Sequence, residues 1–330
     1  MFPLCEVIWV TKAEQKYVIG IDLGGTFIKA ALFDLQGALL EKTKLPTQAE
    51  AGPGTVVDRM ALAGTSLLQE ANLTTGDLLG IGIGVPGNHD FTTGTVLFSP
   101  NLDWRHVPVK TMLESKLPVE VYLDNDANAA ALGELWQGAG QGAQHMVMIT
   151  VGTGVGGGLI LGGRLYRGAT GSAGEIGHTI LLEGGPRCNC GIQGHLEALT
   201  SAPWMVKRVR EALAQGQESS LTNVVNIEAK DIFKAAGEGD ALAQKMVAET
   251  AKYLGMGLAN LVNILNPELI VIGGGVSKAG SLLLEPIREK IKELALEVPA
   301  SSVQVVRARL GNDAGSYGAA ALVLHSRKIL

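Results

Sequence analysis

The order of apolar and polar positions predicts a chain in which strands and helices alternate. An apolar, β-branched run at residues 17–22 predicts a strand that ends at a Leu-Gly-Gly-Thr turn, and two more strands are predicted at residues 27–34 and 38–46. Turn residues between apolar runs of this length are typical of an antiparallel meander. Apolar positions at helical spacing predict helices at residues 56–71, 126–137, 202–214, 240–265 and 281–295.

The same layout returns in the second half of the chain. Residues 146–151 predict a strand, a Gly-Thr-Gly-Val-Gly-Gly turn follows, and two shorter strands are predicted at residues 158–161 and 164–168. A repeat of this kind predicts a duplicated core, with one copy in each lobe and a Gly/Thr turn on each wall of the cleft between them. Near the end, residues 269–277 predict a buried strand that runs into a glycine turn, and residues 311–324 predict a helix with small residues on one side.

Chain length and element order predict two lobes of the α/β class. A chain of 330 residues is too long for one compact core. Strands that alternate with helices favour an α/β fold. We expect an N-terminal lobe at residues 1–125, a C-terminal lobe at residues 126–311, and a terminal helix at residues 312–330 that packs back on the first lobe. The expected hinge lies near residues 124–126.

Composition excludes several classes of function. The net charge is −5 and no long basic stretch occurs, which argues against a nucleic-acid partner because phosphate binding needs clustered Lys and Arg. Three cysteines, with Cys5 standing alone, are too few for a disulfide framework, so we expect a reduced, cytoplasmic protein. Residues 1–16 lack a signal peptide's basic region and cleavage site and are expected to form an extension. Glycines interrupt the uncharged residues 135–163, so no membrane span is expected.

Two glycine turns are candidate phosphate sites. Asp22 ends the first strand, and residues 24–26 offer backbone N–H groups that can form a concave anion site. An Asp beside such a turn can hold Mg²⁺ through water. Thr153 and Gly154 occupy the matching place in the repeat. The alternatives are a plain β-turn with a capping Asp and a flexible hairpin.

A third glycine cluster, at residues 273–275, follows the predicted buried strand. The absence of Cβ atoms there would let a nucleotide approach closely, although a tight strand-to-helix turn is the alternative. None of the glycine motifs is a Walker loop, since no GxxxxGK[ST] occurs. The GxGxxG spacing at residues 152–157 precedes a predicted strand instead of a helix, so it is not a dinucleotide fingerprint.

A carboxylate suited to proton transfer is predicted at Asp126, where a helix begins. Either Asn125 or Asp126 could serve only as the helix N-cap. The alternative is that Asp126 faces the cleft as a base. A carboxylate at a helix N-terminus is expected to stay ionised, because N–H groups and the helix dipole favour the anion. Such a base could take a proton from an alcohol during phosphoryl transfer.

Two thiols and one imidazole lie close together at Cys188, Cys190 and His195. Together with His178 they form a Cys₂His₂ set, which is enough for a closed tetrahedral zinc site. Glu175 precedes His178 by three residues, so both side chains would project on the same side of a turn. The alternative is two buried thiols near an unrelated histidine, which the scarcity of cysteine in this chain disfavours.

Together these motifs resemble the ROK family of sugar kinases and repressors, from about residue 17 to the C-terminus. The segments that carry the resemblance are, in chain order, DLGGT, LDNDANAAALGE, GTGVGGG, EIGH, CNCGIQGHLE and IGGGVS. The resemblance implies an actin-like ATPase (ribonuclease H-like) fold with two similar lobes around a cleft. It also implies ATP- and Mg²⁺-dependent phosphorylation of glucose to glucose 6-phosphate. Another hexose is the alternative substrate, and a non-catalytic sugar-sensing regulator is the other alternative. About 21 residues precede DLGGT, too few for the helix-turn-helix domain of a repressor, so we expect a kinase.

The resemblance also implies roles for individual residues, with Asp126 as the catalytic base. The side chains implied to bind the sugar are Asn101, Asn125, Asp126, Glu175, His178 and Glu197. Those implied to bind ATP or its phosphates are Asp22, Gly24, Gly25, Thr26, Lys29, Thr153, Gly154, Gly274 and Gly275. The implied ligands of a structural zinc are His178, Cys188, Cys190 and His195. His195 stands where the family usually has a third cysteine. The sugar and ATP are the implied partners, together with a second copy of the chain in a homodimer.

Overall fold

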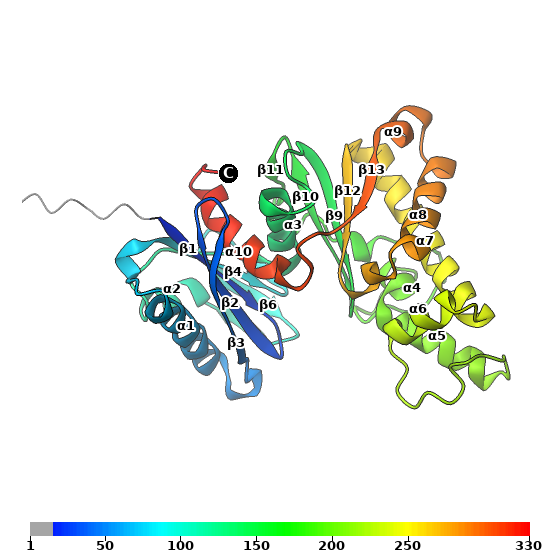
Figure 1. The fold of residues 1–330 in the computed structure, drawn as a ribbon, viewed down its shortest axis with the longest axis horizontal. Coiled ribbons are helices and arrows are strands. Elements are labelled where there is room, and N and C mark those ends of the chain that lie inside the picture. Colours follow the sequence, from blue (N-terminus) through cyan, green and yellow to red (C-terminus); the bar gives the residue numbers. More distant parts are fainter. Residues whose placement is uncertain (1–15) are drawn as a thin grey trace, which may run out of the picture.

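Two five-stranded sheets form the framework of the computed structural model, which describes residues 16–330 (Figure 1). Residues 1–15, which include Cys5 and all but one residue of the expected extension, lie outside the described part of the chain.

The first sheet has the strand order β3-β2-β1-β4-β8. Its first three strands, β1 (Tyr17–Leu23), β2 (Phe27–Asp34) and β3 (Leu39–Pro46), pair antiparallel and confirm the predicted meander. The strands β4 (Leu78–Val85) and β8 (Val121–Asn125) extend the sheet in parallel with β1.

The second sheet repeats the first, with the order β11-β10-β9-β12-β13. The strands β9 (His145–Val151), β10 (Val155–Leu161) and β11 (Arg164–Leu165) pair antiparallel, and β12 (Leu269–Gly273) and β13 (Gln304–Arg307) follow in parallel. The predicted repeat is therefore confirmed. The predicted strand bounds were wrong in two places, because β10 starts three residues earlier than expected and β11 has only two residues.

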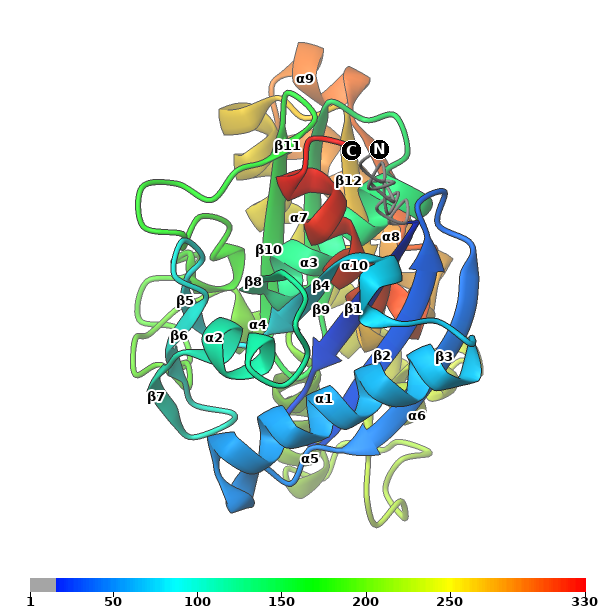
Figure 2. The ribbon, with the colours of Figure 1, turned by 90° about the vertical axis from the view of Figure 1, so that its left-hand side faces the viewer.

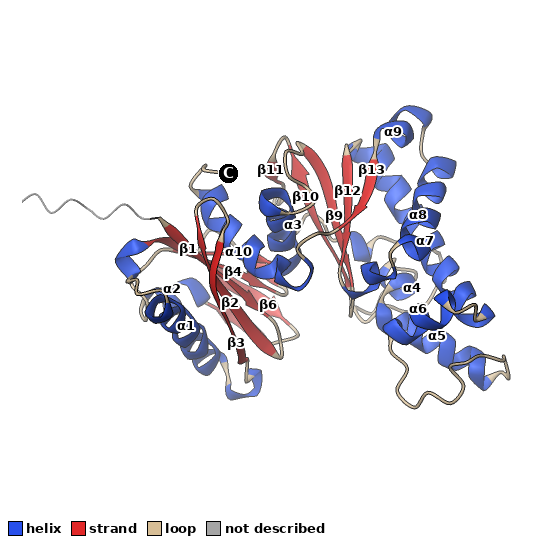
Figure 3. Ribbon diagram, in the orientation of Figure 1, coloured by secondary structure: helices blue, strands red, loops and turns tan. Residues whose placement is uncertain are grey.

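Helices cover both faces of each sheet (Figure 3). Their bounds are α1 (Pro53–Glu70), α2 (Val109–Glu114), α3 (Asp126–Gln137), α4 (Glu197–Thr200), α5 (Ala202–Ala214), α6 (Ala229–Gly237), α7 (Ala241–Leu265), α8 (Ser281–Leu294), α9 (Glu297–Ser302) and α10 (Ala314–Ser326). The predicted helices are all present, and α3 and α5 have the predicted bounds. The short 3-10 helices are η1 (Ala49–Ala51), η2 (Thr75–Asp77), η3 (Ile176–His178), η4 (Gly275–Ala279) and η5 (Gly311–Asp313).

The core has one apolar layer on each side of each sheet. Successive strand side chains point to opposite faces, so Val147, Ile149 and Val151 of β9 pack with the helices of the second lobe, whereas Met146 and Met148 pack on the side of α3 and α10. The helices α1 and α2 cover the outer face of the first sheet, which Figure 2 shows with α1 lying across it. Consequently α3 and α10 lie between the two sheets.

The terminal helix α10 lies directly on the backbone of the first sheet. A Cβ atom on Gly20 of β1 would lie 1.9 Å from the carbonyl oxygen of Ser316, and one on Gly82 of β4 would lie 1.7 Å from that of Ala319. A Cβ atom on Gly318 would lie 1.8 Å from the carbonyl oxygen of Ala129 in α3. The small residues predicted on this helix therefore form its contacts with the first sheet and with α3, and they allow α3 to pack closely against α10.

A small antiparallel sheet of β5 (Asn88–Asp90), β6 (Thr95–Ser99) and β7 (Trp104–Val107) was not predicted. It follows β4 in the chain. Its strands have three to five residues each, too short for a clear alternation of apolar and polar positions. No helix in residues 16–330 has both the length and the apolarity that crossing a membrane requires.

Candidate active site and metal centre

A cavity of about 290 Å³ lies where the ends of β1, β9 and β12 approach the start of α3. Its lining includes four of the residues predicted to bind ATP, namely Asp22, Lys29, Gly274 and Gly275, together with the predicted base Asp126. The cavity thus combines a carboxylate that can bind a cation, a lysine, and glycine backbone that no side chain covers. These groups suit a nucleotide phosphate chain with a hard divalent cation.

Lys29 and Asp22 form an ion pair within this cavity. The register of β1 and β2 places the two residues opposite each other, and Lys29 Nζ lies 3.0 Å from Asp22 Oδ2. The same Nζ lies 3.4 Å from the carbonyl oxygen of Asn312 in the segment before α10. Lys29 thus links the phosphate side of the first lobe to the chain that returns from the second sheet.

Two further basic residues line the cavity, and the sequence analysis missed both. Lys278 lies in η4, three residues after Gly275, and Arg307 ends β13. The position of Lys278 just after the glycine cluster could have indicated a residue that contacts the nucleotide. No sequence pattern indicated Arg307, because only the parallel pairing of β12 with β13 brings this residue to the cavity.

The two predicted phosphate turns are tight backbone turns whose threonines are exposed. In the first, the N–H group of Gly24 donates to the carbonyl oxygen of Phe27 at 3.0 Å, and Thr26 is exposed. In the second, the N–H group of Gly152 donates to the carbonyl oxygen of Gly154 at 2.9 Å, and Thr153 is exposed. These residues are not among the lining residues of the cavity, although the second turn begins beside Gly274, where a Cβ atom would lie 2.3 Å from the carbonyl oxygen of Val151.

The glycines after the second turn have a packing role. A Cβ atom on Gly156 would lie 2.9 Å from the Ala127 side chain, and one on Gly158 would lie 2.6 Å from the Ala131 side chain. Both glycines belong to β10, on which α3 packs. Much of the glycine-rich motif therefore serves close approach of α3 to the second sheet.

A narrow slot of about 60 Å³ lies on the other side of Asp126. Its walls are the turn after β4, the start of α3 and residues 171–175, and it brings together Asn125, Asp126 and Glu175. Asp126 borders both this slot and the larger cavity. The predicted sugar residues Asn101, His178 and Glu197 are not among the slot's lining residues, and Asn101 lies instead beside Gly25 of the first turn.

Burial dominates the electrostatics of Asp126. Asp126 is exposed to solvent at the cleft, but the surrounding protein still desolvates its carboxyl group. This desolvation, together with the charges of Asp22 and, less strongly, Glu175, raises the pKa of Asp126 to about 6. A hydrogen bond from the N–H group of Ala127 at 2.9 Å acts in the opposite direction. The expected stabilisation of the anion by the helix N-terminus is therefore outweighed, because desolvation and like charges both favour the protonated form.

Asn125 is the N-cap of α3. Its Oδ1 accepts hydrogen bonds from the N–H groups of Ala127 at 2.8 Å and Asn128 at 3.3 Å. Its Nδ2 donates to the carbonyl oxygen of Gly87 at 3.3 Å. The cap therefore holds the first turn of α3, and with it Asp126, against the turn that follows β4.

The four predicted metal ligands form one cluster. The donor atoms of His178, Cys188, Cys190 and His195 all lie within 4.8 Å of one another. His195 Nδ1 lies 3.2 Å from both His178 Nδ1 and Cys190 Sγ. Ligand atoms around a tetrahedral zinc, with bonds of about 2.0–2.3 Å, are about 3.3–3.8 Å apart. Two thiols and two imidazoles in this arrangement fit zinc.

The ring of His178 connects this cluster to the cleft. Its Nδ1 faces His195 and Cys188, the latter at 4.0 Å, while its Nε2 lies 4.0 Å from Glu175 Oε2. Glu197 follows the knuckle, by which we mean the cysteine- and glycine-containing residues 188–195. Its Oε1 lies 3.3 Å from Cys188 Sγ. The cluster of thiols and imidazoles is therefore packed together with Glu175 and Glu197, two of the residues predicted to bind the sugar.

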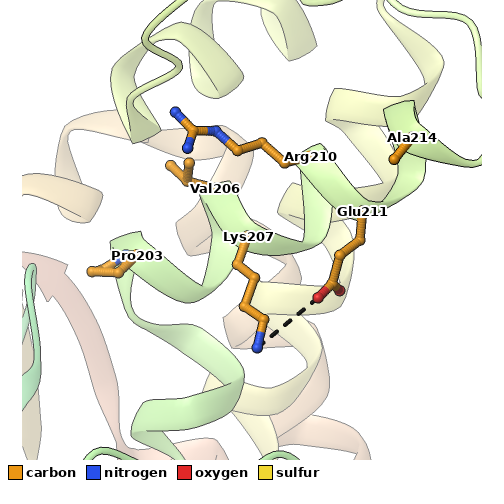
Figure 4. A pocket seen from close by; sticks show the side chains of 6 residues that line it. All are labelled: Pro203, Val206, Lys207, Arg210, Glu211 and Ala214. Atoms are coloured by element: carbon orange, nitrogen blue, oxygen red, sulfur yellow. Dashed lines mark ion pairs between the residues drawn. The ribbon is translucent and has the colours of Figure 1, made fainter.

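A larger cavity of about 500 Å³ lies on α5 and offers no comparable chemistry (Figure 4). Its lining residues come from successive turns of this one helix, namely Pro203, Val206, Lys207, Arg210, Glu211 and Ala214. The pair of Lys207 and Glu211, at 3.9 Å, is an exposed i,i+4 ion pair of the kind common on helix surfaces. We therefore place the functional site at Asp126.

Comparison with known proteins shows the family of the chain. The ROK family model matches residues 18–326. The chain belongs to the ROK family. A glucokinase from Halalkalibacterium halodurans is 44% identical over 94% of this chain and 96% of its own length. A ROK family glucokinase from Streptomyces griseus, solved in complex with glucose and AMPPNP, is 38% identical and superimposes with a TM-score of 0.80 over 93% of this chain and 98% of its own.

Regulators occur among the ROK relatives as well. A putative xylose repressor from a Caldicellulosiruptor species is 35% identical over 93% of this chain, which covers 78% of that protein. The ROK kinases have the actin-like ATPase fold, so the expected fold class is confirmed. Family membership by itself leaves the choice between sugars open.

Proposed function

We propose that this ROK protein is an ATP-dependent glucokinase that forms glucose 6-phosphate. Its family and its glucokinase relatives make it a hexose kinase. The observation that carries the proposal is the position of Asp126, whose carboxylate borders the cavity suited to a nucleotide and the slot lined by Asn125 and Glu175. A proton acceptor between a phosphate donor and an alcohol acceptor is the arrangement that phosphoryl transfer requires.

The donor side would hold ATP with its phosphates near Asp22 and Lys29. Lys29, Lys278 and Arg307 supply positive charge around the cavity, and Gly274 and Gly275 leave room for the nucleoside. Mg²⁺ held near Asp22 would supply charge neutralisation on the phosphates. The exposed hydroxyl groups of Thr26 and Thr153 would contact the phosphates as the two lobes close.

The acceptor side would hold glucose with its 6-hydroxyl group at Asp126. As the hydroxyl oxygen bonds to the γ-phosphorus, its proton passes to the Asp126 carboxylate and the bond to the β-phosphate oxygen breaks, which releases ADP. A base with a pKa of about 6 is largely unprotonated at neutral pH, yet basic enough to accept this proton. Positioning and electrostatics account for most of the catalysis in reactions of this type.

The sugar is held by polar side chains that suit a neutral polyol. The residues assigned to it are Asn101, Asn125, Asp126, Glu175, His178 and Glu197. Three of these are carboxylates, which would repel a negatively charged substrate. Structural zinc bound by His178, Cys188, Cys190 and His195 would fix the ring of His178, so that its Nε2 stays beside Glu175.

A phosphorylation assay over a panel of hexoses with ATP and Mg²⁺ tests the proposal. We expect the highest kcat/KM for glucose, with weaker use of mannose or glucosamine, because a site that pairs every hydroxyl group discriminates strongly. A preference for N-acetylmannosamine, fructose or allose would contradict the choice of glucose and leave the hexose kinase intact. Sugar binding without any phosphorylation would indicate a regulator instead of a kinase.

A further inference from the structure

A buried ion pair joins the two lobes next to the catalytic segment. Asp124 is the last residue but one of β8 in the first sheet, and Arg167 follows β11 of the second sheet. Arg167 Nε lies 2.6 Å from Asp124 Oδ2. We propose that Arg167 is a positioning residue for phosphoryl transfer, which ties the loop carrying Glu175 to the segment carrying Asn125 and Asp126. This inference rests on the proposed kinase function.

Asp124 uses its carboxylate to organise the start of α3. Its Oδ1 accepts hydrogen bonds from the N–H group of Asn125 and from Nδ2 of Asn128, both at 2.8 Å. Only 3% of Asp124 is exposed, so its charge needs a cation at close range. His89 lies nearby, but burial lowers its pKa to about 4, so it is neutral at physiological pH. Arg167 is therefore the group that balances Asp124.

Arg167 also holds the loop that forms the other wall of the slot. Its carbonyl oxygen accepts a hydrogen bond from the N–H group of Ala173 at 3.0 Å, which closes the loop leading to Glu175. Its guanidinium lies over the ring of Phe91, 5.2 Å from the centroid. A Cβ atom on Gly171 would lie 3.2 Å from the same ring. The Arg167 side chain thus contacts the first lobe at Asp124 and Phe91, while its backbone holds the loop of the second lobe.

These contacts connect sugar binding to the position of the base. If the guanidinium is lost, Asp124 becomes an unpaired buried charge directly before Asn125 and Asp126, and the loop before Glu175 loses one of its contacts with the first lobe. Misplacement of a catalytic group by about 1 Å can cost about 10²-fold in rate. Loss of Arg167 should therefore raise KM for the sugar and lower kcat. The KM for ATP should change little, because the nucleotide cavity lies on the other side of Asp126.

The experiment compares the variants Arg167→Met, Arg167→Lys and Arg164→Gln in steady-state kinetics with the preferred hexose. Arg164 lies on β11, three residues before Arg167, and is exposed, so it is the matched control. We expect Arg167→Met to lower kcat/KM for the sugar about 10- to 100-fold with KM for ATP within about twofold of wild type. Arg167→Lys should recover part of the loss, and Arg164→Gln should match wild type. Wild-type kcat and sugar KM in Arg167→Met would overturn the proposal.

A double variant separates positioning from stability. Arg167→Met alone leaves a buried charge and can unfold, whereas Arg167→Met combined with Asp124→Asn removes both charges. The double variant should regain the melting temperature of the wild type but keep the low kcat/KM for the sugar. Recovery of both would show a merely structural pair and overturn the proposal.

Calorimetric sugar affinity provides a readout that does not need catalysis. If the wild type phosphorylates no hexose, the proposed function fails, but the ion pair still predicts weaker sugar binding by the double variant, by about tenfold or more. Unchanged affinity in the folded double variant would overturn the positioning role independently.

Discussion

Glu197 accepts a hydrogen bond through Oε2 from the backbone N–H group of Val155, at 2.9 Å. Through Oε1 the same carboxylate contacts the thiol of Cys188 at 3.3 Å. A Cβ atom on Gly154 would lie 2.7 Å from Glu197 Oε2, so the carboxylate lies directly against the second glycine turn. The segment of residues 188–195 and that turn are therefore joined by one side chain, so a change in this segment should alter the position of the turn at the cleft.

Metal removal should lower both stability and sugar affinity. Elemental analysis of purified protein is expected to show about one zinc per chain, and chelation should lower the melting temperature and raise KM for the sugar, since His178 and Glu197 both contact the cluster. Cys188→Ser should have the same effect, because this thiol is buried in the knuckle. A folded and fully active protein without metal would contradict the assignment.

Replacing the base should abolish turnover and leave binding intact. Asp126→Asn keeps the side-chain volume and the hydrogen bond from Ala127 but cannot accept the proton, so kcat should fall about 10²- to 10⁴-fold. Calorimetry should show sugar and ATP affinities close to those of the wild type. A near-native kcat would mean that another group accepts the proton.

The activity should fall as the pH is lowered through the pKa of Asp126. The base must be unprotonated to accept a proton, and its pKa is raised to about 6, so kcat/KM for the sugar should drop below about pH 6. Steady-state kinetics between pH 5 and pH 8 measure this limb. The residual activity of Asp126→Asn should not fall in this way at low pH. If kcat/KM of that variant still falls below about pH 6, another group is responsible for the pH dependence.

The same raised pKa has a consequence for stability. The native state holds the proton of Asp126 more tightly than the unfolded chain, so this carboxylate destabilises the fold at neutral pH, and the penalty disappears as the pH falls below the native pKa of about 6 towards the unfolded value. Asp126→Asn should therefore raise the melting temperature at pH 7, as is common for destabilised active-site groups. A lower melting temperature at pH 7, with no gain at any pH, would contradict the raised pKa.

Replacing glycine by alanine should affect stability at Gly82 but not at Gly275. Gly82→Ala places a methyl group against the backbone of Ala319 in α10 and should lower the free energy of unfolding by about 1–3 kcal/mol or more. Gly275→Ala meets no atom within 4 Å and should fold normally. Because Gly275 lines the nucleotide cavity, we expect that variant to raise KM for ATP. Urea unfolding and steady-state kinetics check the pair, and equal stability of the two variants would contradict the close packing of α10.

The sequence alone determined the repeat, the principal helices and the members of the cluster of thiols and imidazoles. Antiparallel strands joined by tight turns, and amphipathic helices of a dozen or more residues, depend on local spacing, which periodicity reports directly. The cluster of His178, Cys188, Cys190 and His195 could be proposed because thiols and imidazoles are few in this chain and three of the four lie in one short segment.

Tertiary structure decided the rest of the site. Arg307 reaches the nucleotide cavity only because β12 pairs with β13, and Arg167 meets Asp124 only because α3 and α10 bring the two sheets together. The helix N-terminus was expected to keep Asp126 ionised, but desolvation of the carboxyl group and the charge of Asp22 raise its pKa instead. Desolvation and charge–charge interactions depend on atoms that are distant along the chain and close in space, so no local pattern of residues can encode them.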